Sequence, residues 1–233
     1  MSTLYLLPAY LGETSPQEIF SEQERILLKE LTHFVAENEK TARRFIKFLC
    51  PDVVQSELSF SILDKRTEEQ EIDLIAQPLK EGRNIGLISE AGLPCIADPG
   101  NLLVAWCHRH SIRVVPVNGP SSIILALIAS GLNGQNFAFN GYLPIDSTQR
   151  KKAIQNLESI SKSARSAQIF METPYRNHSL FDDLVKYLNP STKLCIATHI
   201  TLPDESIRTL NIKEWKGKMP DFHKKPTIFI LQA

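Results

Sequence analysis

The sequence predicts an α/β protein with two domains, a parallel amino-terminal sheet and a mixed carboxy-terminal sheet. Three observations support this prediction. Strand and helix patterns alternate as far as residue 117, which is typical of parallel βαβ units. After residue 117, short apolar runs follow one another with fewer helical patterns between them. Loops rich in glycine and proline come directly after several of the apolar runs.

The first half contains four apolar runs of strand length, at 3–7, 33–36, 85–88 and 113–117. Segments with helical periodicity lie between them, at 19–31, 39–49, 68–81 and 102–110. The first of these helices is expected to start from a capping pattern at Ser15-Pro16-Gln17-Glu18.

The second half contains five strand candidates, at 137–139, 167–171, 194–200, 205–212 and 227–231. Predicted helices cover 123–130, 149–160 and 179–188. Short turns at Leu202-Pro203-Asp204 and Met219-Pro220 join the last three strands, which favours antiparallel pairing among them. We therefore expect an N-terminal α/β domain over 1–117 and a C-terminal α/β domain over 118–233.

Composition restricts the class of protein. Lys plus Arg and Asp plus Glu both number 26, so no overall field favours nucleic acid or an anionic membrane, although a local basic patch can still form. The four cysteines are scattered, without metal-ligand spacing, and no apolar run approaches the roughly 18 residues of a membrane span. The amino terminus lacks a signal-peptide pattern. We expect a cytoplasmic protein without membrane segments or a bound metal.

The most informative segment follows the apolar run 85–88 and is dense in glycine, proline and acid. Glycine lets a ligand approach the main chain, and proline stiffens the loop. A similar loop, Asn118-Gly119-Pro120-Ser121-Ser122, follows the run 113–117 and opens a helix. Many such loops are simple turns. Two of them at the carboxyl ends of buried strands nevertheless predict a small-molecule cleft.

These segments resemble the tetrapyrrole methylase superfamily, in particular its ribosomal RNA small-subunit methyltransferase I branch. The resemblance rests on five blocks in the order and spacing of that branch: Ile88-Ser89-Glu90-Ala91-Gly92-Leu93-Pro94-Cys95-Ile96-Ala97-Asp98-Pro99-Gly100, Val114-Val115-Pro116-Val117-Asn118-Gly119-Pro120-Ser121-Ser122, Ser130-Gly131-Leu132, Phe139-Asn140-Gly141-Tyr142-Leu143-Pro144 and Glu172-Thr173-Pro174-Tyr175-Arg176. Together they cover roughly positions 85 to 176.

The resemblance implies a homodimer that holds S-adenosylmethionine in a cleft between two α/β domains and methylates a 2'-hydroxyl of RNA. Carried over by position, the cofactor-binding residues are Pro8, Gly92, Leu93, Ile96, Ala97, Ser121, Ser122, Ala197, Thr198 and Thr227. The helix start at Ser121-Ser122 offers free N–H groups to a carboxylate. The sequence has no G-x-G-x-x-G turn, which argues against ordinary dinucleotide binding.

Methyl transfer to a hydroxyl or amine requires a proton acceptor. The catalytic candidates are Glu90, Glu37 and His199, and Glu13 and Glu172 are further carboxylates near the motifs. Two of these candidates, Glu90 and His199, have an alternative, structural interpretation. Glu90 could organise its own loop, a role that we expect for Asp98, and His199 could be a hydrogen-bonded core histidine.

The roles of two basic features and of one apolar helix are left open. Arg150-Lys151-Lys152 places three cations together and forms either a solvated face or an RNA-steering surface, and a second basic stretch contains Lys213, Lys216, Lys218, Lys224 and Lys225. Arg176 either binds a phosphate or pairs with Glu172. The apolar helix 123–128 is either buried, which we favour, or forms a dimer contact.

Segments 9–13, 37–40 and 198–202 depart from the family pattern. They motivate one alternative, a catalytically degenerate protein that binds the cofactor. A further alternative is a methyltransferase that acts on a tetrapyrrole or another small molecule.

Overall fold

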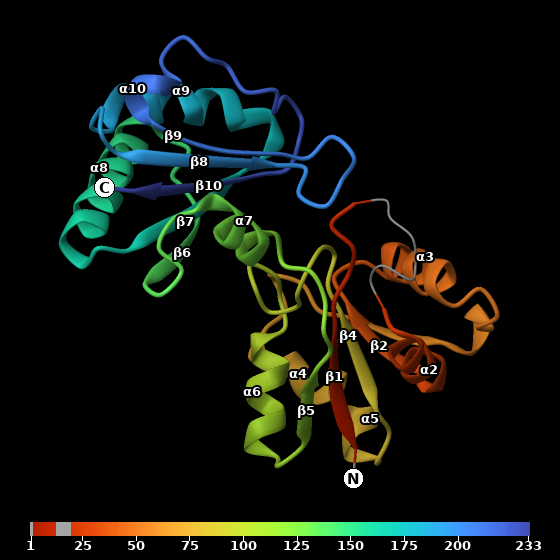
Figure 1. The fold of residues 1–233 in the computed structure, drawn as a ribbon. Coiled ribbons are helices and arrows are strands. Elements are labelled where there is room, and N and C mark those ends of the chain that lie inside the picture. Colours follow the sequence, from red (N-terminus) through yellow and green to blue (C-terminus); the bar gives the residue numbers. More distant parts are fainter. Residues whose placement is uncertain (1, 13–19) are drawn as a thin grey trace. The chain divides into compact units, whose positions relative to one another are not determined.

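The computed structural model describes residues 2–12 and 20–233, and the chain divides into two compact units, Met1–Ser121 and Ser122–Ala233 (Figure 1). Each unit contains a five-stranded sheet. The sheet of the first unit is parallel and that of the second is mixed, which confirms the predicted α/β class.

The first sheet has the strand order β3-β2-β4-β1-β5, and all four neighbouring pairs are parallel. Its strands are β1 (Thr3–Leu7), β2 (His33–Ala36), β3 (Ser59–Ile62), β4 (Ile85–Ile88) and β5 (Arg113–Pro116). Strand β3 was not predicted. Its alternation of serine with Phe60 and Ile62 is short, and as an edge strand it is partly exposed, so its pattern is weak.

The helices of the first unit are α2 (Glu22–Glu30), α3 (Glu39–Leu49), α4 (Glu69–Ile75), α5 (Gln77–Lys80) and α6 (Asn101–Arg109). The predicted capping segment 15–18 lies outside the described residues. Helix α2 instead begins after Ser21, which forms a capping box with Glu24. The single helix predicted over 68–81 is wrong, because it is divided at Ala76. Pro78 lies in the first turn of α5, where its missing N–H costs no hydrogen bond.

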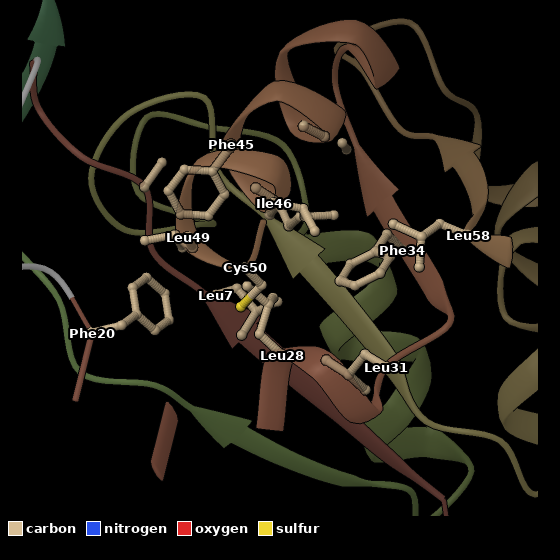
Figure 2. Close-up of a cluster of buried hydrophobic side chains, with 14 of the residues drawn as sticks. Leu7, Phe20, Leu28, Leu31, Phe34, Phe45, Ile46, Leu49, Cys50 and Leu58 are labelled. Carbon is tan, nitrogen blue, oxygen red and sulfur yellow. The ribbon is translucent and has the colours of Figure 1, made fainter. Parts of the chain in front are cut away.

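Two apolar clusters cover opposite faces of this sheet. One joins α2 and α3 to the sheet through Leu7 and Phe34 (Figure 2). The other joins α4, α5 and α6 to it through Leu4 and Val35, whose side chains point the opposite way along the same strands. Neighbouring strands β1 and β4 therefore lead to helices on opposite faces. This reversal marks the place where open α/β sheets bind ligands.

The second sheet has the order β6-β7-β10-β8-β9, in which β6 and β7 are parallel and the other pairs are antiparallel. Its strands are β6 (Phe137–Tyr142), β7 (Ala167–Glu172), β8 (Lys193–Thr198), β9 (Ser206–Asn211) and β10 (Thr227–Gln232). Antiparallel pairing of the last three strands is confirmed for β8 with β9 and with β10. The expectation that β9 and β10 are neighbours in the sheet is wrong, because β10 lies between β7 and β8. Strand β10 is almost entirely buried, so it occupies the centre, whereas the more exposed β9 takes an edge.

Helices α8 (Ser147–Ala164), α9 (Asn177–Tyr187) and α10 (Ile212–Trp215) share a core with Phe170, Ile196 and Phe229. Helix α7 (Ser122–Ser130) buries Ile123 and Leu127, but Ile124 is 42% and Ile128 is 72% exposed. The expectation that this apolar helix is buried is therefore wrong for two of its three isoleucines.

Arg150 corrects the predicted cluster of three cations on α8. Its side chain is buried, with Nε 2.7 Å from Asp183 Oδ2 and Nη2 donating to Ser179 Oγ at 3.0 Å. Lys151 lies over the ring of Tyr187, 5.3 Å from its centroid. The basic tripeptide thus joins α8 to α9 rather than forming one solvated patch.

Within residues 2–12 and 20–233, no helix combines the length and the apolar character needed to cross a bilayer.

Gly86, at the centre of the first sheet, is expected to tolerate no side chain. A Cβ there would lie 2.6 Å from Leu7 Cδ1 and 3.0 Å from the ring of Phe34. Gly86→Ala should destabilise the fold by about 1–3 kcal/mol through overpacking. Urea unfolding measures the change. Gly134→Ala is the matched control, since its Cβ meets open space. Equal unfolding midpoints for both variants would contradict this expectation.

Candidate functional site

Three loops of the first unit meet at the carboxyl edge of its sheet. Ala9, after β1, and Gly92, after β4, exchange two backbone hydrogen bonds of 2.8 and 3.1 Å. A Cβ on Gly92 would lie 3.4 Å from the carbonyl oxygen of Pro120, which follows β5. A Cβ on Gly119 would lie 2.2 Å from Cγ of Pro8. Gly119 is therefore required for its loop to pack against Pro8, whereas Gly92 is favoured by its φ of 74°.

The loop after β4 has an unusual backbone. Gly92 and Gly100 have positive φ angles of 74° and 134°, and so do the non-glycine residues Cys95 and Ala97, at 67° and 60°. A non-glycine residue in this region costs of order 1–3 kcal/mol and is kept only where its surroundings fix it. Such backbone strain is concentrated at binding sites, so this loop is a functional candidate.

Asp98 holds this loop in shape. Its Oδ2 accepts a hydrogen bond from Ser89 Oγ at 2.6 Å and from the Glu90 backbone N–H at 3.3 Å. The structural role predicted for Asp98 is confirmed. The Glu90 carboxylate does not organise the loop; it is exposed and accepts from Thr41 Oγ1 at 2.7 Å.

Glu37 follows β2 at the same edge and is partly buried. Burial raises the pKa of its carboxyl, and the nearby carboxylates of Asp98 and Glu90 raise it further, whereas Lys65 opposes them. The structure thus brings two of the three predicted catalytic residues, Glu37 and Glu90, to one sheet edge. A carboxyl whose pKa is raised toward neutrality is a better proton acceptor.

In the second unit, one row of residues crosses the sheet at the end of β7 and β8 and the start of β9 and β10. The row runs through Glu172, Thr227, Thr198 and Ser206, which pair in register. The hydroxyls of Thr198 and Thr227 lie 3.2 Å apart, and Asn177 Nδ2 lies 3.2 Å from Thr227 Oγ1. Ala197, also predicted, is fully buried beside Thr198.

Two acceptor atoms of this buried cluster lack a donor among the described residues: Oε2 of Glu172 and Oδ1 of Asn177. The other Glu172 oxygen, Oε1, accepts from the Thr173 N–H at 2.6 Å and from Arg176 Nε at 2.9 Å. Arg176 therefore pairs with Glu172, one of its two predicted roles. Asn177 was missed, because no local sequence pattern distinguishes it from other helix-start asparagines.

His199 was expected on an apolar strand, and this is wrong. Strand β8 ends at Thr198, and His199 turns the chain away with a φ of 48°. Its Nδ1 lies 2.8 Å from Oδ1 of Asp204, and Asp204 also pairs with Lys225 at 3.0 Å. These two partners, Lys225 first, lower the pKa of Asp204 to about 2. The imidazole is thus anchored at the surface rather than in the core.

The predicted cofactor residues fall into two groups, one in each unit. Pro8, Gly92, Leu93, Ile96 and Ala97 belong to the loops of the first sheet. Ser121 ends the first unit and Ser122 begins α7, whereas Ala197, Thr198 and Thr227 belong to the second sheet. Glu13 lies outside the described residues. No group of three metal-ligating side chains occurs in the part of the chain that the structure describes.

The family model of the Tetrapyrrole (Corrin/Porphyrin) Methylases matches residues 22–216. The chain is 34% identical over 177 residues to ribosomal RNA small subunit methyltransferase I of Pasteurella multocida, covering 75% of this chain and 62% of that protein. It is 35% identical to the protein of the same name from Haemophilus influenzae, covering 75% of this chain and 61% of that protein. The chain thus spans about six tenths of the length of these curated relatives.

Solved structures share the fold. The methyltransferase CobJ has a TM-score of 0.63 at 15% identity, with 100% of this chain and 95% of that chain covered. The cobalt precorrin-4 methyltransferase CbiF has a TM-score of 0.60 at 13% identity, with 99% and 94% covered. At these identities the likeness concerns the fold alone.

The Asp204 cluster is expected to titrate at acid pH. A depressed pKa means that its contribution to stability is present above the ordinary value of 3.8 and is lost as the pH falls through about 2. In an NMR titration of the Asp204 carboxyl, Lys225→Ala should move the midpoint up toward 3.8. Lys224→Ala, at the adjacent position, is the control. An unchanged midpoint in Lys225→Ala would show that the ion pair does not set this pKa.

Proposed function

Since the chain belongs to the tetrapyrrole (corrin/porphyrin) methylase family, we propose that it transfers a methyl group from S-adenosylmethionine to ribosomal RNA. The junction of three strand-end loops at Ala9, Gly92 and Pro120 is the observation that supports this proposal most directly. The two curated relatives described above favour an RNA acceptor over a tetrapyrrole, because both bear the name of a ribosomal RNA methyltransferase.

The proposed cofactor site uses residues of both α/β domains, 1–117 and 118–233. On the side of the first domain, Pro8 and the left-handed loop of Gly92, Leu93, Ile96 and Ala97 would present main-chain groups to the cofactor. The start of α7, at Ser121 and Ser122, would bind its carboxylate through backbone N–H groups.

On the side of the second domain, the site would use Ala197, Thr198 and Thr227. The donor-poor cluster around Thr227 fits a ligand with N–H donors, since Glu172 Oε2 and Asn177 Oδ1 are buried acceptors without a partner among the described residues. When bound, the cofactor supplies a methyl group activated on a sulfonium sulfur.

The chain's own residues would then align the acceptor, exclude water and accept a proton. Glu37 is the proposed proton acceptor, because its burial among other carboxylates raises its pKa. Glu90, held by Thr41, would position the acceptor beside it. His199, anchored by Asp204, is a second candidate for proton transfer.

The protein is proposed to act in the cytoplasm as a homodimer. Cytoplasmic location is supported by four free cysteines. Dimerisation is supported by the exposed isoleucines of α7, Ile124 and Ile128, and by the exposed aromatic side chains Phe137 and Tyr142 of edge strand β6. Large exposed apolar side chains are typical of protein interfaces, and these four lie on two elements that follow one another in the chain.

Gly92→Val is expected to weaken binding of S-adenosylmethionine by roughly a hundredfold. Valine at a φ of 74° is strained and its side chain would enter the space beside Pro120. A penalty of about 3 kcal/mol corresponds to roughly a hundredfold in Kd. Calorimetry measures the binding, and transfer of a labelled methyl group to small-subunit ribosomal RNA measures the activity.

Gly134→Val is the matched control, because its side chain would meet open space. It should bind the cofactor as the wild type does. No heat with the wild-type protein would contradict the proposed cofactor. Binding without labelled RNA would contradict the proposed acceptor.

Ile128→Glu is expected to convert the dimer to a monomer, because it places a charge on the exposed face of α7. Sedimentation velocity at micromolar concentration measures the change. Leu74→Glu, on α4 of the first unit, is the control, since Leu74 is 79% exposed. A wild-type monomer, or a dimer that persists in Ile128→Glu, would contradict this assignment of the interface.

A further inference from the structure

A groove runs along the second unit beside the row of Thr198 and Ser206. It consists of two cavities, of about 430 and 690 Å³, that share Trp215, Lys218 and Met219 as wall residues. The first cavity reaches Thr198, Ser206 and Arg208, and the second reaches α9 at Phe181 and Lys186. The shared wall makes them one continuous surface feature, here called the 215–219 groove.

The 215–219 groove is positively charged in a chain whose formal net charge is zero. Four exposed cations line it: Lys186, Arg208, Lys216 and Lys218. Among the described residues, none of the four forms an ion pair. Of the two acids in its walls, Asp221 is paired with Lys225 at 2.8 Å, and Asp182 opposes the cations. Glu214 also lies near Lys218. The four cations outnumber these acids, so the groove presents a net positive local field.

Apolar surface accompanies these cations. Trp215 is buried and its indole N–H donates to the Leu194 carbonyl at 2.9 Å, which fixes that wall. Met219, 55% exposed, lies on the shared wall between Lys218 and Pro220. Trp215 and Phe181 are buried, so Met219 is the side chain that offers apolar surface to a base. Cations beside this exposed side chain match a single nucleic-acid strand, which offers phosphates and base faces together.

We propose that the 215–219 groove binds a single-stranded stretch of the RNA acceptor, next to the nucleotide that is methylated. This inference rests on the proposed function. The groove begins at Thr198, one of the residues proposed to bind the cofactor, so a strand held in it is led to that site. Arg208, Lys216, Lys218 and Lys186 would contact phosphates, and Met219 would contact a base.

The test is the double variant Lys216→Glu with Lys218→Glu, titrated with a fluorescent 12-nucleotide oligouridylate. The slope of log affinity against log salt is negative, and each lost phosphate contact reduces its magnitude by about 0.7. Two lost contacts should therefore reduce it by about 1.4. Affinity at low salt should fall on the order of tenfold or more. Both lysines are exposed, and an unchanged thermal midpoint verifies that the fold is intact.

The matched control is Lys162→Glu with Lys193→Glu, which makes the same charge change at exposed positions outside the groove walls. It should bind oligouridylate nearly as the wild type does. Equal losses in both double variants, or no loss in the groove variant, would overturn the proposal. So would wild-type affinity for a 12-base-pair RNA duplex as high as for the single strand.

Cofactor binding distinguishes this proposal from the proposed function. If the groove variant loses RNA but keeps S-adenosylmethionine in calorimetry, both proposals stand. If the wild-type protein binds RNA through the groove but does not bind S-adenosylmethionine, the groove proposal stands and the proposal of methyl transfer is contradicted.

Discussion

The pair of backbone hydrogen bonds between Ala9 and Gly92 is the constraint on which the first unit's site depends. It ties together the loops of two neighbouring strands whose helices lie on opposite faces of the sheet. With Gly119 packed on Pro8, the third loop is fixed against the first. None of these contacts requires a particular functional side chain. The geometry is set by the main chain, so a ligand bound there would be recognised largely by main-chain groups.

The two units differ in how the hydrogen bonds of their carboxylates are satisfied. In the first, Asp98 satisfies Ser89 and the Glu90 N–H and keeps a strained loop rigid. In the second, Glu172 is fully buried, satisfied at one oxygen by Arg176 and left without a donor at the other among the described residues. A buried carboxylate oxygen without a donor is costly. Its retention beside Thr227 is consistent with a polar ligand at that edge.

Much of the fold was predictable from local patterns, because buried strands such as β4 and β8 are continuous apolar runs. Local sequence patterns did not predict the elements whose structure depends on their neighbours in the fold. Strand β3 is a short edge strand, Pro78 divides a helix whose periodicity is otherwise regular, and the central place of β10 follows from burial on both faces. The connection from β9 to β10 covers residues 212–226 and includes α10, so its length is compatible with several places for β10 in the sheet.

The candidate site divides in the same way. Glycine and proline patterns located the loops, and Asp98 behaved as expected. The environment of each ionisable group could not be read from sequence, because it depends on residues distant along the chain. Arg150 is the clearest case: a residue in a basic tripeptide proved to be the buried partner of Asp183. The cations that we propose to bind RNA lie instead along the 215–219 groove, whose walls include residues of α9 and β9.

The backbone of the loop after β4 also determines how its one thiol behaves. Cys95 is packed against Gly100, and burial, with a smaller effect of Asp98, raises its pKa to about 11. At neutral pH only about one thiol in ten thousand is then ionised, and the thiolate is the reactive form. The cysteine therefore fills space beside Gly100 as a small, largely protonated side chain that reacts slowly with electrophiles.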